Sequence, residues 1–244
     1  MKIRRYLQFQ LYISIIGSLF LFAGIAWTKD TALESAPGAI GLSGIKASAS
    51  EGAIIDLNNR GYMLLNQGNV SAAEQVFKQA LDQISLRGRA SPTLLITSLN
   101  GIGLCNFQER KFADAQKAYL EAMKLVDANP AEDGHVHAMV LNNLGQAYRN
   151  QFKLELAQPC YEQAIKTEAG LPDPDRRFLA SVKCNLGLLY FQQKRYTEAE
   201  PIFTQGMSVL RDTAGESDPA YGSYIPYYKA VLEANGHTSS IPGI

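Results

Sequence analysis

Residues 141–164 read LNNLGQAYRNQFKLELAQPCYEQA, and residues 183–206, 42 positions further along the chain, read KCNLGLLYFQQKRYTEAEPIFTQG. When the two stretches are aligned, Gly145 corresponds to Gly187, and the order of apolar, aromatic and small residues is similar. Neither stretch alternates polar and apolar residues as a half-buried strand would. The pair therefore predicts a helical unit that is repeated with a period of 42 residues.

The same period extends over four repeats, which start at Ile54, Ile96, Ala138 and Ala180. Four columns hold one type of residue throughout: glycine in column eight (Gly61, Gly103, Gly145, Gly187), alanine in column twenty (Ala73, Ala115, Ala157, Ala199), an aromatic residue in column twenty-four (Phe77, Tyr119, Tyr161, Phe203) and a small residue in column twenty-seven (Ala80, Ala122, Ala164, Gly206). The small residues let two helices of a hairpin approach closely, and we expect the aromatic ring to fill the space between that hairpin and the next. The pattern predicts an all-α solenoid, in which each hairpin buries its apolar face against its neighbours.

Turn-forming residues recur at consistent places in the repeats. Gly68 marks the turn between the two helices of the first repeat, and prolines at 92, 130, 172 and 219 separate the hairpins. A fifth segment resembles a first helix without a partner, and we expect it to cap the apolar end of the solenoid. The predicted domain covers residues 53–236, with hairpins near 54–95, 96–137, 138–179 and 180–221, a capping helix over 222–236 and a tail over 237–244.

These columns match the tetratricopeptide repeat, whose usual period is about 34 residues. The longer period resembles the kinesin light-chain type of this repeat, as do the runs Leu141-Asn142-Asn143-Leu144-Gly145 and Ala199-Glu200-Pro201-Ile202-Phe203 and the proline-containing connectors at 171–175 and 216–219. The resemblance extends from Ile54 to about Asn235, and the first repeat departs most from it because Arg60 stands where leucine is usual. It implies a platform that binds other proteins.

The amino terminus has the pattern of an export signal. Lys2, Arg4 and Arg5 precede an uncharged stretch over residues 6–28, in which residues 24–26 offer small side chains for cleavage. About 20 apolar residues also suffice to span a bilayer, so cleavage and retention as a membrane anchor both remain open for residues 1–28. In either case we expect the repeat domain outside the cytoplasm, in a bacterial periplasm or cell envelope. Residues 29–52 are small and polar and predict a flexible linker.

Composition excludes some classes of partner. The chain of 244 residues is 46% hydrophobic and 19% charged, which is typical of a folded protein. Lys and Arg number 23 and Asp and Glu also number 23, so the net charge is zero. A protein that binds nucleic acid through its phosphates would need a surplus of positive charge. We therefore expect no nucleic-acid partner; membrane contact is expected through the N-terminal segment if it is retained.

Helical spacing indicates a stripe of amides on the first helix of each repeat. Columns two, six, nine and thirteen lie four, three and four positions apart, and in tetratricopeptide folds this stripe lines the concave wall. Columns six and thirteen hold seven amides in eight places, which would suit the backbone of an extended peptide. Two alternatives remain open: the amides solvate an exposed face, and the neighbouring column five (Asn58, Asn100, Asn142) bonds between repeats. The predicted peptide-binding groove is Asn59, Tyr62, Asn66, Gln108, Met139, Asn143, Gln146, Asn150, Asn185, Leu188 and Gln192.

Signals for catalysis or metal binding are weak. Cys105, Cys160 and Cys184 form no CxxC pair, and we expect them to be small apolar fillers. The run His135-Val136-His137 falls at a hairpin junction without a further ligand nearby, and Asp173 and Asp175 are expected to start a helix. No phosphate-binding glycine loop or nucleophile motif is present in the sequence. We expect no cofactor, no metal site and no catalytic residues.

Two classes of function follow from the sequence. The leading hypothesis is a non-enzymatic scaffold, exported or membrane-tethered, that binds a segment of another protein in the amide-lined groove. The alternative is a structural module that assembles with itself in the cell envelope. A predicted capping helix favours the first, because a solenoid that stacks end to end would keep both ends apolar.

Overall fold

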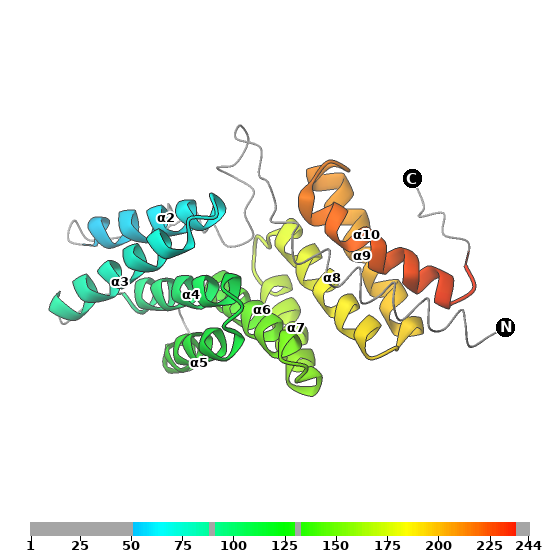
Figure 1. The fold of residues 1–244 in the computed structure, drawn as a ribbon, viewed down its shortest axis with the longest axis horizontal. Helices are drawn as coiled ribbons and strands as arrows, with labels where there is room; N and C mark the ends of the chain where they lie inside the picture. The colour runs from blue at the N-terminus through cyan, green and yellow to red at the C-terminus, as the bar shows by residue number, and fades with distance from the viewer. Residues whose placement is uncertain (1–50, 88–90, 130–132, 238–244) are drawn as a thin grey trace. The chain divides into compact units, whose positions relative to one another are not determined.

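A computed structural model describes residues 51–87, 91–129 and 133–237 (Figure 1). The predicted signal or anchor at 1–28, almost all of the predicted linker and nearly all of the tail lie outside these residues. No helix in the described ranges combines the length and the apolar character that crossing a membrane requires. Those ranges hold nine α-helices and no strand: α2 Gly52–Asn66, α3 Val70–Arg87, α4 Pro92–Gln108, α5 Phe112–Ala128, α6 Gly134–Asn150, α7 Leu154–Ala169, α8 Arg176–Gln192, α9 Tyr196–Ala214 and α10 Pro219–Ala234.

The helices pair into four hairpins that follow one another in chain order, from α2–α3 to α8–α9 (Figure 1). Each first helix also contacts the next first helix, from α2 against α4 to α8 against α10, whereas the second helices make no comparably extensive contact with each other in the described ranges. The first helices therefore lie on the side where successive hairpins are closest together. We call the surface formed by α2, α4, α6, α8 and α10 the inner wall.

The turn inside each hairpin has the same conformation in all four repeats. Column fifteen is left-handed each time, with φ of 76° at Gly68, 62° at Arg110, 58° at Phe152 and 61° at Lys194. The amide of the following residue then bonds back to the first helix, as Lys153 N does to the Tyr148 carbonyl at 3.0 Å. This bond is typical of the Schellman motif that ends helices. A regular stop at column fifteen keeps the four hairpins in register.

Aspartates fix the starts of three first helices. The side chain of Asp133 accepts from His135 N at the start of α6, Asp175 accepts from Phe178 N at α8, and Asp218 accepts from Ala220 N and Tyr221 N at α10. These bonds satisfy amides that have no partner inside the helix. Asp175 is thus a helix-start acid, as the sequence predicts.

The glycine and aromatic columns pack against each other within each hairpin. A side chain at Gly145 would place its Cβ 2.8 Å from the Tyr161 ring, and one at Gly61 would lie 2.6 Å from the Phe77 ring. Real Cβ atoms do not approach other atoms so closely, so the ring requires glycine in column eight. Phe77 also reaches Gly101 of the next repeat, which confirms that the ring fills space between hairpins.

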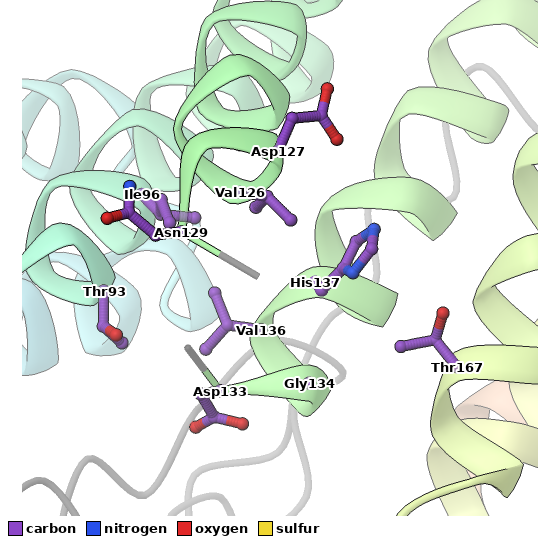
Figure 2. A pocket seen from close by; sticks show the side chains of 10 residues that line it. All are labelled: Thr93, Ile96, Val126, Asp127, Asn129, Asp133, Gly134, Val136, His137 and Thr167. Atoms are coloured by element: carbon purple, nitrogen blue, oxygen red, sulfur yellow. The ribbon is translucent and has the colours of Figure 1, made fainter. Parts of the chain in front are cut away.

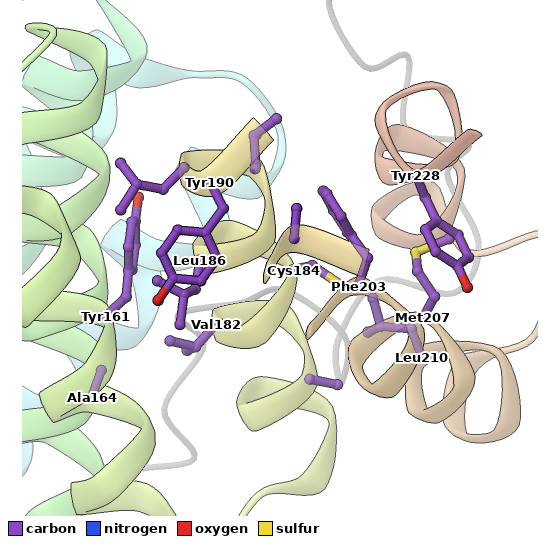
Figure 3. Close-up of a cluster of buried hydrophobic side chains, with 14 of the residues drawn as sticks. Tyr161, Ala164, Val182, Cys184, Leu186, Tyr190, Phe203, Met207, Leu210 and Tyr228 are labelled. Atoms are coloured by element: carbon purple, nitrogen blue, oxygen red, sulfur yellow. The ribbon is translucent and has the colours of Figure 1, made fainter. Parts of the chain in front are cut away.

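The apolar core continues without interruption from α6 to α10 (Figure 3). Cys184, Phe203, Leu210 and Val231 are fully buried in it. The capping helix begins three residues earlier than the predicted 222, because the Asp218 cap starts it at Pro219. Arg177 of α8 forms an ion pair with Asp218, which ties the start of α10 to the preceding hairpin. α10 therefore covers the apolar face that α8 and α9 would otherwise expose.

Candidate functional site on the inner wall

Asparagines on the inner wall bond to one another across the repeats. Asn143 Nδ2 of α6 donates to Asn100 Oδ1 of α4 at 2.9 Å, and Asn185 Nδ2 of α8 donates to Asn142 Oδ1 of α6 at 2.9 Å. Within α6, Asn142 Nδ2 donates to Asn143 Oδ1 at 3.3 Å. In both inter-repeat bonds a column-six amide donates to a column-five amide of the preceding repeat. We call these four residues the asparagine chain.

Tyrosines close both ends of the asparagine chain. At one end, Asn100 Nδ2 donates to the Tyr62 hydroxyl of α2 at 3.1 Å, and that hydroxyl donates to the Thr97 carbonyl at 3.0 Å. At the other end, the Tyr224 hydroxyl of α10 donates to Asn185 Oδ1 at 2.9 Å. The result is a hydrogen-bonded path that runs through all five first helices. Bonding between repeats by column five, an alternative that the sequence left open, is therefore present.

This network changes the interpretation of the predicted groove. Asn143 and Asn185 are only 6% and 7% exposed, and their amides are used inside the fold. Asn143 and Asn185 are therefore not free to bond a peptide backbone, as the predicted groove requires, because each faces the preceding first helix rather than solvent. Tyr62, Met139 and Leu188 are buried as well, so they contribute to the packing beneath the surface of the inner wall.

The accessible amides of the predicted groove lie mainly in column thirteen. Gln108 and Gln192 are exposed, Asn66 and Asn150 are half-buried, and Asn150 Nδ2 bonds to the backbone carbonyl of Gln146 at 2.9 Å. We call Asn66, Gln108, Asn150 and Gln192 the amide row. Gln146 is also half-buried, and Asn59 is exposed on α2. The row recurs at the last turn of α2, α4, α6 and α8, so its members repeat along the wall.

Charge differs between the three middle first helices and the second helices that follow them. α4, α6 and α8 carry Arg149, Arg176, Arg177 and Lys183 and no acidic residue, whereas α5, α7 and α9 carry nine acidic and four basic residues. Arg177 is paired with Asp218, and Lys183 Nζ donates to Gln205. Arg149 is absent from the predicted groove, although it lies three residues from Gln146, a spacing that places the two on one side of α6. Counting the charged residues of the first and second helices separately would have singled out Arg149 in the sequence.

The three cysteines are free thiols in the structure. Burial raises the pKa of Cys105 to about 12 and that of Cys160 to about 11, and it raises the pKa of Cys184 further still. A thiol must lose its proton to act as a nucleophile. At neutral pH all three are protonated, which agrees with their predicted role as fillers.

A pocket of about 340 Å³ lies where α4, α5, α6 and α7 meet (Figure 2). Burial lowers the pKa of His137 in its lining, so this imidazole is neutral at pH 7. In the ranges that the structure describes, no three metal-ligating side chains come together. The pocket is lined by Thr93, Ile96, Val126, Asp127, Asn129, Asp133, Gly134, Val136, His137 and Thr167.

His135 takes part in a buried junction between α6, α7 and α8. Glu168, in the last turn of α7, is fully buried; its Oε2 lies 2.8 Å from His135 Nδ1, and its Oε1 accepts from the amide of Asp175 at 2.7 Å. The hydrogen bond that the Glu168 carboxylate accepts from the imidazole raises the pKa of His135. His135 and Glu168 belong to α6 and α7, and Glu168 also bonds to the residue before α8. The pair is therefore part of the connection between hairpins three and four.

Four helical hairpins and a capping helix, joined along one wall by a hydrogen-bonded path, define a helical repeat protein. The chain belongs to the tetratricopeptide repeat family: one model of this repeat matches residues 94–168 and 136–212, and a second matches residues 57–82. No curated protein sequence matches the chain.

Solved structures with a similar fold include two helical repeat proteins. The crystal structure of BtubC (BKLC) from P. vanneervenii matches with a TM-score of 0.63 and 19% identity, over 80% of this chain and 88% of that one. A crystal structure of the putative kinesin light chain nearly identical TPR-like repeats from Podosopora anserina matches with a TM-score of 0.57 and 13% identity, over 75% of this chain and 87% of that one. The resemblance to kinesin light-chain repeats that the sequence predicts is thereby confirmed for the fold.

Proposed function

We propose that the protein is a non-enzymatic scaffold whose inner wall binds a segment of a partner protein. The observation that carries this proposal is the amide row, with Gln108 and Gln192 exposed in the same column of α4 and α8. An amide offers both donors and an acceptor, so a row of them can bond an extended backbone whatever its side chains. Membership of the tetratricopeptide repeat family supports the proposal, because proteins of this family commonly bind proteins or peptides.

The ends of the solenoid favour binding over end-to-end self-assembly. At the N-terminal end, Asp56, Asn59 and Arg60 of α2 are exposed, although Met63 is also 43% exposed. At the C-terminal end, Lys229 and Glu233 of α10 are exposed. Stacked repeats bury apolar faces against each other, and a polar face opposes such stacking. Both end helices therefore present mainly solvated surfaces.

For the location, we infer export or membrane tethering from the sequence alone. The basic residues at 2–5 and the apolar stretch that follows support this inference. A reporter enzyme that works only outside the cytoplasm, fused after residue 52, is expected to be active. Activity of a cytoplasm-specific reporter at the same position would contradict export.

The binding surface can be tested by site-specific photo-crosslinking of the full-length chain in its native cells. A photoreactive residue is placed at Gln108 or Gln192 on the inner wall, and at the exposed Gln79 or Gln163 on the second helices as matched controls. We expect one adduct of defined mass at both inner-wall positions and not at the controls. Equal yields at all four positions, or adducts at the controls alone, would refute the inner wall as the binding surface.

A further inference from the structure

The turn of hairpin three carries an exposed phenylalanine. Phe152 stands in column fifteen, where the other repeats have Gly68, Arg110 and Lys194, and its φ is 58°. Bulky side chains rarely adopt this left-handed conformation. The side chain is also 83% exposed, so it adds nothing to the apolar core. Neither the turn nor the core therefore accounts for a phenylalanine at this position.

The residue that follows Phe152 is a lysine whose charge is not neutralised by a carboxylate. Lys153 Nζ donates to the side-chain oxygens of Gln116 and Gln151 at 3.0 Å and 2.7 Å. None of the ion pairs between described residues includes Lys153. Hairpin three thus ends in an exposed aromatic ring next to a cation. We call Phe152 and Lys153 the tip.

The pocket between α4, α5, α6 and α7 has complementary properties. Its lining includes the buried apolar residues Ile96, Val126 and Val136 and the exposed carboxylates Asp127 and Asp133, and no Lys or Arg among the described residues. In the view of Figure 2, the two aspartates lie on opposite sides of the two valines. No ion pair between described residues includes either aspartate. Since a cavity of about 150 Å³ accepts benzene, the pocket of about 340 Å³ has room for a phenyl ring.

The tip and the pocket lie at opposite ends of hairpin three. Gly134, the first residue of α6, lines the pocket, whereas Asn150, the last residue of α6, stands two positions before Phe152. The 17 residues of α6 span about 25 Å. Thr167, close to the end of α7, lines the pocket as well. The tip therefore cannot reach the pocket of its own chain.

We propose that the tip of one chain inserts into the pocket of a second copy of this chain. Phe152 contacts the apolar lining, and Lys153 lies near Asp127 and Asp133. Both halves of the contact are present in one chain and are complementary in charge, which favours a second copy over an unrelated partner. The contact is head to tail, so each added copy leaves one tip and one pocket free. The inference goes beyond the proposed function, because it uses neither the amide row nor the end helices.

Sedimentation equilibrium of the full-length chain in density-matched detergent micelles measures this association over about 1–1000 µM, because one ring in a pocket makes a small and weak interface. We expect the average mass to rise with concentration. Phe152→Gly should raise the dissociation constant by about tenfold or more, as expected when one buried phenylalanine side chain is lost. This variant should fold, because Gly68 holds the same position in repeat one. The matched control, Leu86→Ser, removes an equally exposed apolar side chain from α3 and should leave the dissociation constant unchanged.

A mixture of two variants tests whether a tip meets a pocket. Thr167→Trp places a large ring in the pocket and, like Phe152→Gly, should prevent the variant from associating with itself. The Phe152→Gly chain still offers a pocket, and the Thr167→Trp chain still offers a tip. The mixture should therefore form a one-to-one complex and no larger species. If Thr167→Trp fails to fold, Asp127→Lys takes its place, because it reverses a charge of the pocket at an exposed residue.

Three results would overturn the proposal. A wild-type chain that stays monomeric over the whole range forms no such contact. Association that Phe152→Gly leaves unchanged would come from another part of the chain, such as the N-terminal segment. If Thr167→Trp and Asp127→Lys both associate like the wild type, the tip does not bind the pocket, and a contact between two tips becomes the explanation.

Discussion

At the residue scale, short asparagine side chains connect first helices that lie in contact with each other. Asn143 lies at this position on α6 and uses both ends of its amide, donating to Asn100 and accepting from Asn142. An apolar residue in its place would leave both neighbours unsatisfied. Each member of the asparagine chain therefore supplies a hydrogen-bond partner to the next.

Asn143→Ala should destabilise the protein by about 1–3 kcal/mol, because the side-chain oxygen of Asn100 loses a donor in a buried place. The matched control is Gln108→Ala, which removes an exposed amide from the neighbouring first helix and should change stability by less than about 0.5 kcal/mol. Denaturant unfolding followed by circular dichroism compares the two. A loss no larger for Asn143→Ala than for the control would mean that the asparagine chain does not contribute to stability.

At the scale of elements, the junctions between hairpins depend on a few buried polar contacts. Glu168 lies in the last turn of α7 and bonds to both the first turn of α6 and the amide that precedes α8. His135, its partner, also packs edge-on against Phe178 of α8, with ring centroids 5.1 Å apart. One carboxylate therefore holds three helices together, and its partner is a residue that titrates near neutral pH.

The two histidines of α6 should give opposite dependences of stability on pH. The folded-state pKa of His135 is raised by Glu168, with Asp133 and Asp175 contributing, so its contribution is complete below about pH 6.5 and is lost as pH rises through the folded pKa. The pKa of His137 is lowered by burial, so its contribution is present above about pH 6.5 and is lost as pH falls.

Each histidine can be observed with the other replaced. In His137→Gln, the free energy of unfolding should fall as pH rises above about 6.5; in His135→Gln, it should rise as pH increases toward about 6.5 from below. Urea unfolding at half-unit steps measures both slopes. Slopes of the same sign in the two variants would show that one of the two environments is not as described.

At the scale of the whole domain, α10 ends the solenoid and belongs to its inner wall. It buries Tyr221, Tyr228, Val231 and Leu232 against the preceding hairpin, and Asn235 bonds to Glu200 of α9. Its last turn closes like those of the other first helices, with His237 N bonded to the Leu232 carbonyl at 2.9 Å. Tyr224 adds the final bond to the asparagine chain.

Removing α10 should therefore cost more than removing the residues after it. A chain that ends at Ala214 exposes the surface that α10 covers, at about 1.5–3 kcal/mol for each large apolar side chain uncovered. A chain that ends at His237 retains every contact described for α10 and should melt like the full-length protein. Equal melting temperatures for the two truncated chains would show that α10 does not act as a cap.

The sequence alone determined the period of 42 residues, the hairpins, the small and aromatic columns that pack together and the place of the capping helix. These features follow from the spacing of residues along one helix, because that spacing sets the direction in which each side chain points from the helix axis. The tertiary structure decided which side chains of the inner wall are buried and which remain exposed. Columns five and six lie at the edge between buried and exposed faces, and packing against the preceding hairpin buried Asn143 and Asn185, whereas Gln108 and Gln192 remain exposed.

The contacts that matter most join different helices and residues far apart in the chain, such as Asn143 with Asn100 and Glu168 with His135, at separations of 43 and 33 residues. Their distances depend on how consecutive hairpins are rotated against each other. That rotation results from packing along the whole domain, so no local pattern in the sequence specifies it.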